Sequence, residues 1–153
     1  MAVAAKVLAV AAPDLTPPRA VRAEGVEPRF VATEADSRTA AIVDAVGAEI
    51  ASVGTGNLAV ITPASISLEV SDALDAAGIS HGEAYRGALN QQITVVPIGL
   101  VKGLELDAAI VVEPARIVAE QQQGLRALYV ALTRATQRLT VVHAEPLPWF
   151  LTD

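Results

Sequence analysis

Residues 93–112, ITVVPIGLVKGLELDAAIVV, decide the fold class of this chain. Two continuous apolar runs, at 93–96 and 108–112, flank a connection that contains two glycines. Apolar runs without polar alternation are typical of parallel strands that are buried on both faces. The segment therefore predicts two buried strands of a parallel sheet, joined by residues 97–107.

The sequence on either side alternates between apolar runs and amphipathic stretches. The predicted elements are a strand at 29–33, a helix at 37–53, a strand at 58–62, a helix at 66–79, a loop at 85–92, a helix at 122–136 and a strand at 139–143. Alternating strands and helices imply an α/β fold with a parallel sheet and right-handed crossovers.

The amino-acid composition narrows the possible classes of fold and function further. The chain has 153 residues, of which 52% are hydrophobic and 18% charged, so we expect one domain with a large core rather than a disordered chain. Aromatic residues make up only 3%, which excludes a long groove of stacked aromatics. A net charge of −6 argues against charge-driven binding of nucleic acid by this chain alone. The absence of cysteine excludes disulfides and thiolate metal sites.

The expected domain organisation follows from the positions of the prolines and from where the alternation of predicted strands and helices begins and ends. We expect a short helix and a proline-rich connection at 1–28, the α/β domain at 29–146 and a tail at 147–153. The alanine-rich start resembles an export signal, but Lys6 lies within the apolar run, and no run approaches the ~20 apolar residues of a membrane span. A cytoplasmic protein that makes no membrane contact is the expectation.

The connection KGLELD, residues 102–107, is one candidate binding segment. Ligands of open parallel sheets lie at the carboxyl ends of the strands, and we expect the connection there because it follows the first apolar run. Gly99 and Gly103 allow close approach of the backbone to a ligand. Lys102 can hold an anion, and Glu105 can accept hydrogen bonds from a pair of hydroxyls. The alternative is a solvated connection whose charges have no function.

Arg134 is the second candidate, and we expect it at the same carboxyl ends. Four apolar residues form one stripe along its predicted helix: Leu125, Leu128, Tyr129 and Leu132. At about 100° per residue, Arg134 lies about 180° from Leu125 and points away from the core. An arginine in this position could reach a phosphate that belongs to another domain. The alternative is a solvated arginine that complements the dipole at the helix C-terminus.

Other chemistry has little support in the sequence. His81 and His143 are far apart and are not in a metal-ligand spacing, so we predict no metal site. The chain contains neither a GxSxG nucleophile elbow nor a GxxxxGK[ST] phosphate loop. Without a phosphate loop, this chain alone is expected neither to hold a nucleoside triphosphate tightly nor to hydrolyse it.

Two blocks of the sequence resemble motifs of a known family, the UvrD/Rep type of superfamily one helicases. Residues 102–107, KGLELD, are similar to motif V, KGLEFD, and residues 128–135, LYVALTRA, are similar to motif VI. Residues 58–79 are similar to the strand and helix that precede motif V in the second RecA-like domain. The resemblance covers about residues 1–145, and two motifs in the right order are more specific than either alone.

The resemblance implies a RecA-like parallel sheet with helices on both faces, the second motor domain of an ATP-dependent DNA helicase. In the family, ATP with Mg²⁺ lies between two RecA-like domains, and the first holds the phosphates and the metal. By motif match, Lys102, Gly103, Glu105 and Arg134 would bind the nucleotide. Glu105 would contact the ribose, and Arg134 would be the catalytic arginine finger that stabilises charge on the transferred γ-phosphoryl group. The implied partners are the first RecA-like domain of the same polypeptide and single-stranded DNA.

Departures from the family pattern sharpen this expectation. Pro97 and Gly99 stand where many members have a threonine and a histidine, and a proline there is similar to the helicase D branch, whose members associate with RNA polymerase. Leu106 replaces the usual phenylalanine. Motif IV, with its NYR signature, is absent, and Met1 falls just after its expected end, so we expect a fragment of a longer polypeptide. The alternative function is a non-catalytic α/β interaction module that docks on RNA polymerase or another protein.

Overall fold

The structure, a computed structural model, describes most of the predicted α/β domain. The described residues are 28–84, 92–101, 104, 106–120 and 123–147. The predicted N-terminal helix with its proline-rich connection, most of the loop at 85–92, most of the tail and three site residues, Lys102, Gly103 and Glu105, lie outside them.

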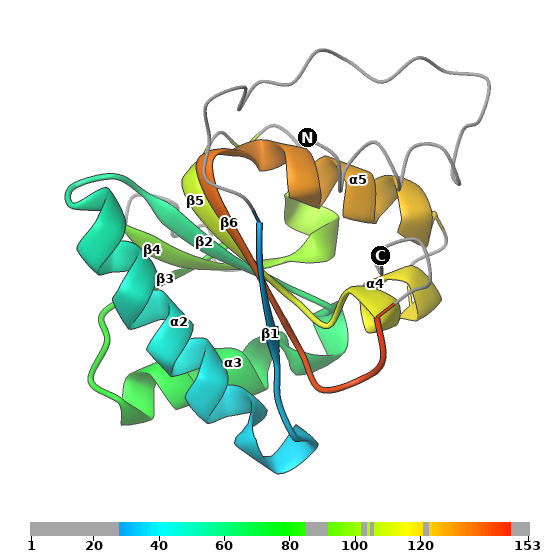
Figure 1. Cartoon of the computed structure of the whole chain (residues 1–153), viewed down its shortest axis with the longest axis horizontal. Coiled ribbons are helices and arrows are strands. Elements are labelled where there is room, and N and C mark those ends of the chain that lie inside the picture. The colour runs from blue at the N-terminus through cyan, green and yellow to red at the C-terminus, as the bar shows by residue number, and fades with distance from the viewer. Residues whose placement is uncertain (1–27, 85–91, 102–103, 105, 121–122, 148–153) are drawn as a thin grey trace.

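Within the described residues, six strands form one sheet in the order β1-β6-β5-β2-β4-β3, and every neighbouring pair is parallel (Figure 1). The strands are β1 Arg29–Ala32, β2 Leu58–Thr62, β3 Gly82–Glu83, β4 Ile93–Pro97, β5 Leu106–Val112 and β6 Ala135–His143. The two apolar runs that predicted buried strands form β4 and β5, which lie on either side of β2. The prediction of a parallel α/β sheet is confirmed.

Helices cover both faces of the sheet (Figure 1). The helices are α2 Arg38–Val53, α3 Ser67–Ala76, α4 Pro114–Glu120 and α5 Gly124–Arg134, with short 3-10 turns at Ala35–Ser37, Ala64–Ile66 and Ile98–Leu100. One face packs against α2 and α3, and the other packs against α4 and α5. None of the helices within the described part of the chain is long and apolar enough to cross a membrane.

The central strand β2 illustrates why the strand sequences are continuously apolar. All five of its residues are buried. Leu58 and Val60 belong to the cluster beneath α2 and α3, whereas Ala59 and Ile61 belong to the cluster beneath α4 and α5. Because side chains alternate between the two faces of a strand, a strand covered on both faces favours apolar residues at every position. The one polar residue of β2, Thr62, shares a hydrogen bond with the Ser67 hydroxyl at 2.6 Å.

Three parts of the fold differ from the sequence prediction. Helix α4, of seven residues, and strand β3, of two, were not predicted, because such short elements have too little periodicity to detect. Strand β6 begins at Ala135, four residues before the predicted start. The polar residues Gln137 and Arg138 conceal this beginning, since both bond to residues far away in the sequence, Asp107 and Glu49.

Candidate functional site

The C-terminal ends of the two motif-like segments meet at the amino edge of the sheet, by which we mean the end where the parallel strands begin. Leu106, the first residue of β5, is paired with Ala135, the first residue of β6. Leu106 lies in the segment 102–107, and Ala135 is the last residue of the segment 128–135. The expected position at the opposite, carboxyl edge is therefore wrong for these parts of both segments.

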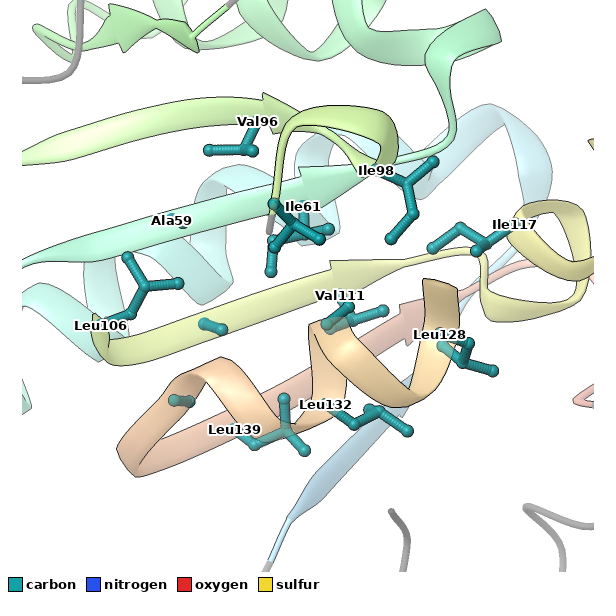
Figure 2. Packing of buried hydrophobic residues seen from close by; sticks show 14 of the residues in the cluster. Ala59, Ile61, Val96, Ile98, Leu106, Val111, Ile117, Leu128, Leu132 and Leu139 are labelled. Atoms are coloured by element: carbon teal, nitrogen blue, oxygen red, sulfur yellow. The ribbon is translucent and has the colours of Figure 1, made fainter. Parts of the chain in front are cut away.

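The connection between β4 and β5 explains the error. Because the two strands are parallel, the chain leaves β4 at the carboxyl edge and has to return to the amino edge before β5 can begin. Ile98 and Val101 are 2% exposed and belong to the same apolar cluster as Leu128 of α5. Figure 2 shows Ile98 and Leu128 within this packing. The first part of the connection is thus built into the core, beneath the helix that carries Arg134.

Arg134 is the last residue of α5, and Ala135 directly after it begins β6. Leu128 and Leu132 are fully buried, and Leu125 and Tyr129 pack against the same cluster, so the predicted apolar stripe is confirmed. The half-buried Arg134 donates from Nε to the Val130 carbonyl at 3.3 Å. Since that carbonyl lies in the last turn of the helix, the contact agrees with the simpler interpretation of a C-terminal arginine.

A second contact of Arg134 is weaker still. Its Nη2 lies 3.5 Å from the hydroxyl of Thr133, which itself donates to the Val130 carbonyl at 2.9 Å. Burial raises the pKa of the Tyr129 hydroxyl, and the nearby positive charge of Arg134 opposes part of that increase. The guanidinium is therefore held on its own helix by two long hydrogen bonds, next to a phenol that stays protonated at neutral pH.

Asp107, the last residue of the first motif-like segment, joins three strands at the amino edge. Its backbone N–H donates to Asn57 Oδ1 at 2.8 Å, and the Asn57 N–H donates to Asp107 Oδ2 at 2.9 Å. Its other carboxylate oxygen accepts a hydrogen bond from Gln137 Nε2 at 3.2 Å. Asp107 thus links the beginning of β5 to the residue before β2 and to the third residue of β6.

The turn before β2 fits closely against this carboxylate. A Cβ added at Gly56 would lie 2.6 Å from Asp107 Oδ2, so glycine is the residue that leaves room for it. Gln92 Nε2 donates to the carbonyls of Gly54 and Gly56, at 2.6 and 3.0 Å, and holds the same turn from the other side. Sequence reasoning did not find these residues. The available signal was a Gly–Asn pair directly before a buried strand.

The carboxyl edge holds a different arrangement, a buried ion cluster that sequence reasoning also missed. Glu113 follows β5, is 0% exposed and has a positive φ of 51°. One of its carboxylate oxygens accepts a hydrogen bond from Arg38 Nη1 at 2.7 Å, and the other accepts the N–H groups of Ala144 and Glu145 at 2.9 and 3.2 Å. Arg38 Nη2 also pairs with Glu69 at 3.0 Å.

The electrostatics of Arg38 explain how this cluster is tolerated in the core. Burial lowers the pKa of its guanidinium, but hydrogen bonds and charge from Glu113 and Glu69 outweigh burial and raise the pKa above its usual value. The Arg38 guanidinium therefore keeps its positive charge although it is buried. The cluster connects α2 and α3 with the ends of β5 and β6.

The two histidines make local contacts. His81 Nδ1 donates to the Ile79 carbonyl at 2.9 Å, and its Nε2 lies 2.8 Å from the hydroxyl of Ser71. His143 Nδ1 donates to the Glu145 carbonyl at 2.9 Å. Among the described residues, no group of three or more histidine, aspartate or glutamate side chains could hold a metal ion.

Residues 92–142 match the family of UvrD-like helicase C-terminal domains. This range contains both motif-like segments and the two strands that join them at the amino edge. No curated protein matches the chain.

Among solved structures, the fold is similar to the C-terminal domain of a possible DNA helicase from Lactobacillus plantarum. The TM-score is 0.72 at 22% identity, and the match covers 99% of this chain and 89% of that one. The SWI2/SNF2 ATPase core of Sulfolobus solfataricus, solved in complex with double-stranded DNA, matches with a TM-score of 0.57 at 15% identity over 80% of this chain. The arterivirus nonstructural protein 10, a helicase, matches with a TM-score of 0.53 at 17% identity over 82%. This chain spans 30% and 31% of the latter two.

Proposed function

We propose that this chain is the second motor domain of a UvrD-type ATP-dependent DNA helicase or translocase. It would close over ATP bound by a first RecA-like domain and supply Arg134 as the arginine finger. The observation that carries the proposal is the pairing of Leu106 with Ala135, which brings the ends of the two motif-like segments together at one edge. Residues distant in sequence thereby come to adjoining positions, as a shared nucleotide site requires.

The chemistry assigned to Arg134 is electrostatic. Phosphoryl transfer spreads negative charge over the transferred group, and a positioned guanidinium stabilises that charge more in the transition state than in the ground state. Two of the five N–H donors of Arg134 take part in its long hydrogen bonds to Val130 and Thr133. Exchanging such long bonds for charge-assisted bonds to a phosphate is favourable.

The other motif residues complete the proposed contacts. Glu105 would bind the ribose hydroxyls, Gly103 would allow the backbone to approach the nucleotide, and Lys102 would support the loop or hold an anion. Mg²⁺ and the phosphates would be held mainly by the phosphate loop of the first domain. Opening and closing of the cleft between the domains would move them along single-stranded DNA.

We further propose that the chain belongs to the helicase D branch, because Pro97 stands at the position where many related helicases have a threonine. Pro97 ends β4 at the carboxyl edge, beside Thr62 of β2. Association with RNA polymerase would follow from that assignment.

The test is ATP hydrolysis by a protein that contains both motor domains. Arg134→Ala should lower kcat on the order of 10³-fold or more, because the charge on the transferred group loses its stabilisation. Arg126→Ala is the matched control, since it removes an exposed guanidinium from the same helix and should leave turnover unchanged. Both variants should unfold at the parent's temperature. Near-parent turnover by Arg134→Ala would overturn the proposal.

A further inference from the structure

We propose that Asp107 and Gln137 act as positioning residues for Arg134, by fixing the junction between α5 and β6 relative to β5. The proposal rests on the proposed function, because it concerns how the arginine finger is held. It adds two residues to which neither the motif comparison nor the family match assigns a role. Their contact is the hydrogen bond from Gln137 Nε2 to Asp107 Oδ1, at 3.2 Å.

The first argument is the length of the junction. Helix α5 ends at Arg134, and β6 begins at Ala135, so no loop residue separates the helix from the strand. Ala135 has extended backbone angles of φ −78° and ψ 130°, and it is fully buried. A side chain at a junction without a loop takes its direction from both elements. Small movements at the beginning of β6 are therefore transmitted directly to Arg134.

The second argument is an irregularity at this point of the strand. Leu106 pairs with Ala135, whereas Ala108 pairs with Arg138, so two steps along β5 correspond to three along β6. The extra residue is a bulge, a feature that changes the direction of side chains and is frequent beside active sites. Gln137 lies within the bulge, and its bond to Asp107 connects the irregular strand back to β5.

The third argument is that Asp107 is itself fixed. Its second carboxylate oxygen accepts the Asn57 N–H at 2.9 Å, and its own N–H donates to Asn57 Oδ1 at 2.8 Å. Asn57 directly precedes β2, the central strand, whose five residues are all buried. The bulge is therefore tied through one carboxylate to the beginning of a fully buried central strand.

The position of this network distinguishes positioning from simple stabilisation. Gln137 and Asn57 are exposed, and hydrogen bonds at such a site add little to the stability of the fold. An error of about 1 Å in the position of a catalytic group, by contrast, can lower a rate by about 10²-fold. Breaking the contact should therefore change turnover far more than stability.

The experiment measures kcat and KM for ATP, together with the midpoint of thermal unfolding, in the protein with both motor domains. Gln137→Glu places a second carboxylate against Asp107 and should lower kcat by about 10- to 10²-fold, with KM and the unfolding midpoint nearly unchanged. The double variant Asp107→Asn/Gln137→Glu restores a carboxylate–amide pair with donor and acceptor exchanged. It should recover most of kcat.

Two further variants keep the result interpretable. Gln123→Glu adds the same charge directly before α5, at an exposed position, and should behave like the parent. Gln137→Ala removes the hydrogen bond without adding charge. It replaces Gln137→Glu as the test of this contact if Gln137→Glu fails to fold. It should lower kcat in the same direction.

The outcomes separate this proposal from the one on which it rests. A fall in kcat for Gln137→Glu with recovery in the double variant supports it. Parent-like kcat in both Gln137 variants overturns it, as does a joint fall in kcat and unfolding midpoint without recovery. If Arg134→Ala is inactive while the Gln137 variants keep parent turnover, only the positioning proposal fails. If Arg134→Ala keeps its turnover, the finger itself is rejected.

Discussion

The amino and carboxyl edges of the sheet differ in what fills them. At the carboxyl edge, Glu113 is 0% exposed, and its carboxylate is fully engaged by Arg38 and two backbone N–H groups. At the amino edge, Asp107 makes a comparable number of hydrogen bonds, but its partners Asn57 and Gln137 are exposed.

The buried ion cluster and the exposed hydrogen-bond network therefore suit different roles. In open parallel sheets, ligands usually lie at the carboxyl edge. Here the chain uses its own charged side chains at that edge, while Leu106 and Ala135, which belong to the two motif-like segments, lie at the amino edge. A buried ion pair is costly to break, whereas an exposed hydrogen-bond network contributes little to the stability of the fold. We therefore expect stability to depend on the first edge and activity on the second.

The largest effect on stability is expected for Arg38→Met. It leaves the buried carboxylate of Glu113 without its cationic partner, and loss of one partner of a buried pair typically costs about 3–5 kcal/mol. Urea unfolding of the chain measures the loss of unfolding free energy. Glu69→Gln is the control, because this second partner of Arg38 is 51% exposed and should cost less than about 1 kcal/mol. Equal effects of the two variants would contradict the account.

A smaller loss is expected for Gly124→Ala, at the beginning of α5. The added Cβ would lie 2.3 Å from the carbonyl oxygen of Val118, and backbone atoms of α4 cannot move aside independently. Overpacking of this kind typically costs about 1–3 kcal/mol. Gly47→Ala in α2 is the matched control, since nothing lies within 4 Å of its added Cβ, and it should stabilise the fold by about 0.4–1 kcal/mol. Similar melting temperatures for the two variants would rule out this packing argument.

The smallest effect on stability is expected for Gly56→Ala, where the same added Cβ meets a side chain. It would lie 2.6 Å from Asp107 Oδ2, and the carboxylate can rotate away at the loss of an exposed hydrogen bond, about 1 kcal/mol. Turnover should nevertheless fall, because the rotated Asp107 no longer holds Gln137. Unfolding measurements on this variant give the loss of stability, and ATPase measurements give the change in turnover. A loss of stability with unchanged turnover would show that the amino edge has no positioning role.

Much of the fold could be predicted from sequence because it depends on patterns that are local. The predicted strand at 58–62 coincides with β2, since a strand buried on both faces needs only a continuous apolar run. The helix at 37–53 agrees with α2 to within one residue, because its apolar residues recur at helical spacing up to Gly54, which has a positive φ of 63°.

The contacts between elements could not be predicted in the same way. Arg38 lies 75 residues from Glu113 and 31 from Glu69, and each of the three, considered alone, is typical of a solvated surface charge. The candidate site, residues 102–107 and Arg134, was predicted from motifs and stays a prediction. The pairing of Leu106 with Ala135 at the amino edge was not foreseen, because it depends on a connection that packs Ile98 and Val101 against a face of the sheet.

We propose that residues at the amino edge are needed for ATP hydrolysis, whereas residues at the carboxyl edge stabilise the fold. The most direct test of this proposal is to measure ATP turnover and the unfolding midpoint of Arg134→Ala and Arg38→Met side by side, in the protein with both motor domains, at a temperature where both are folded. We predict that Arg134→Ala loses ATP turnover but unfolds at the parent's midpoint. Arg38→Met should keep ATP turnover, while its unfolding midpoint falls by several degrees. The reverse pattern, with turnover lost in folded Arg38→Met and retained in Arg134→Ala, would contradict the account.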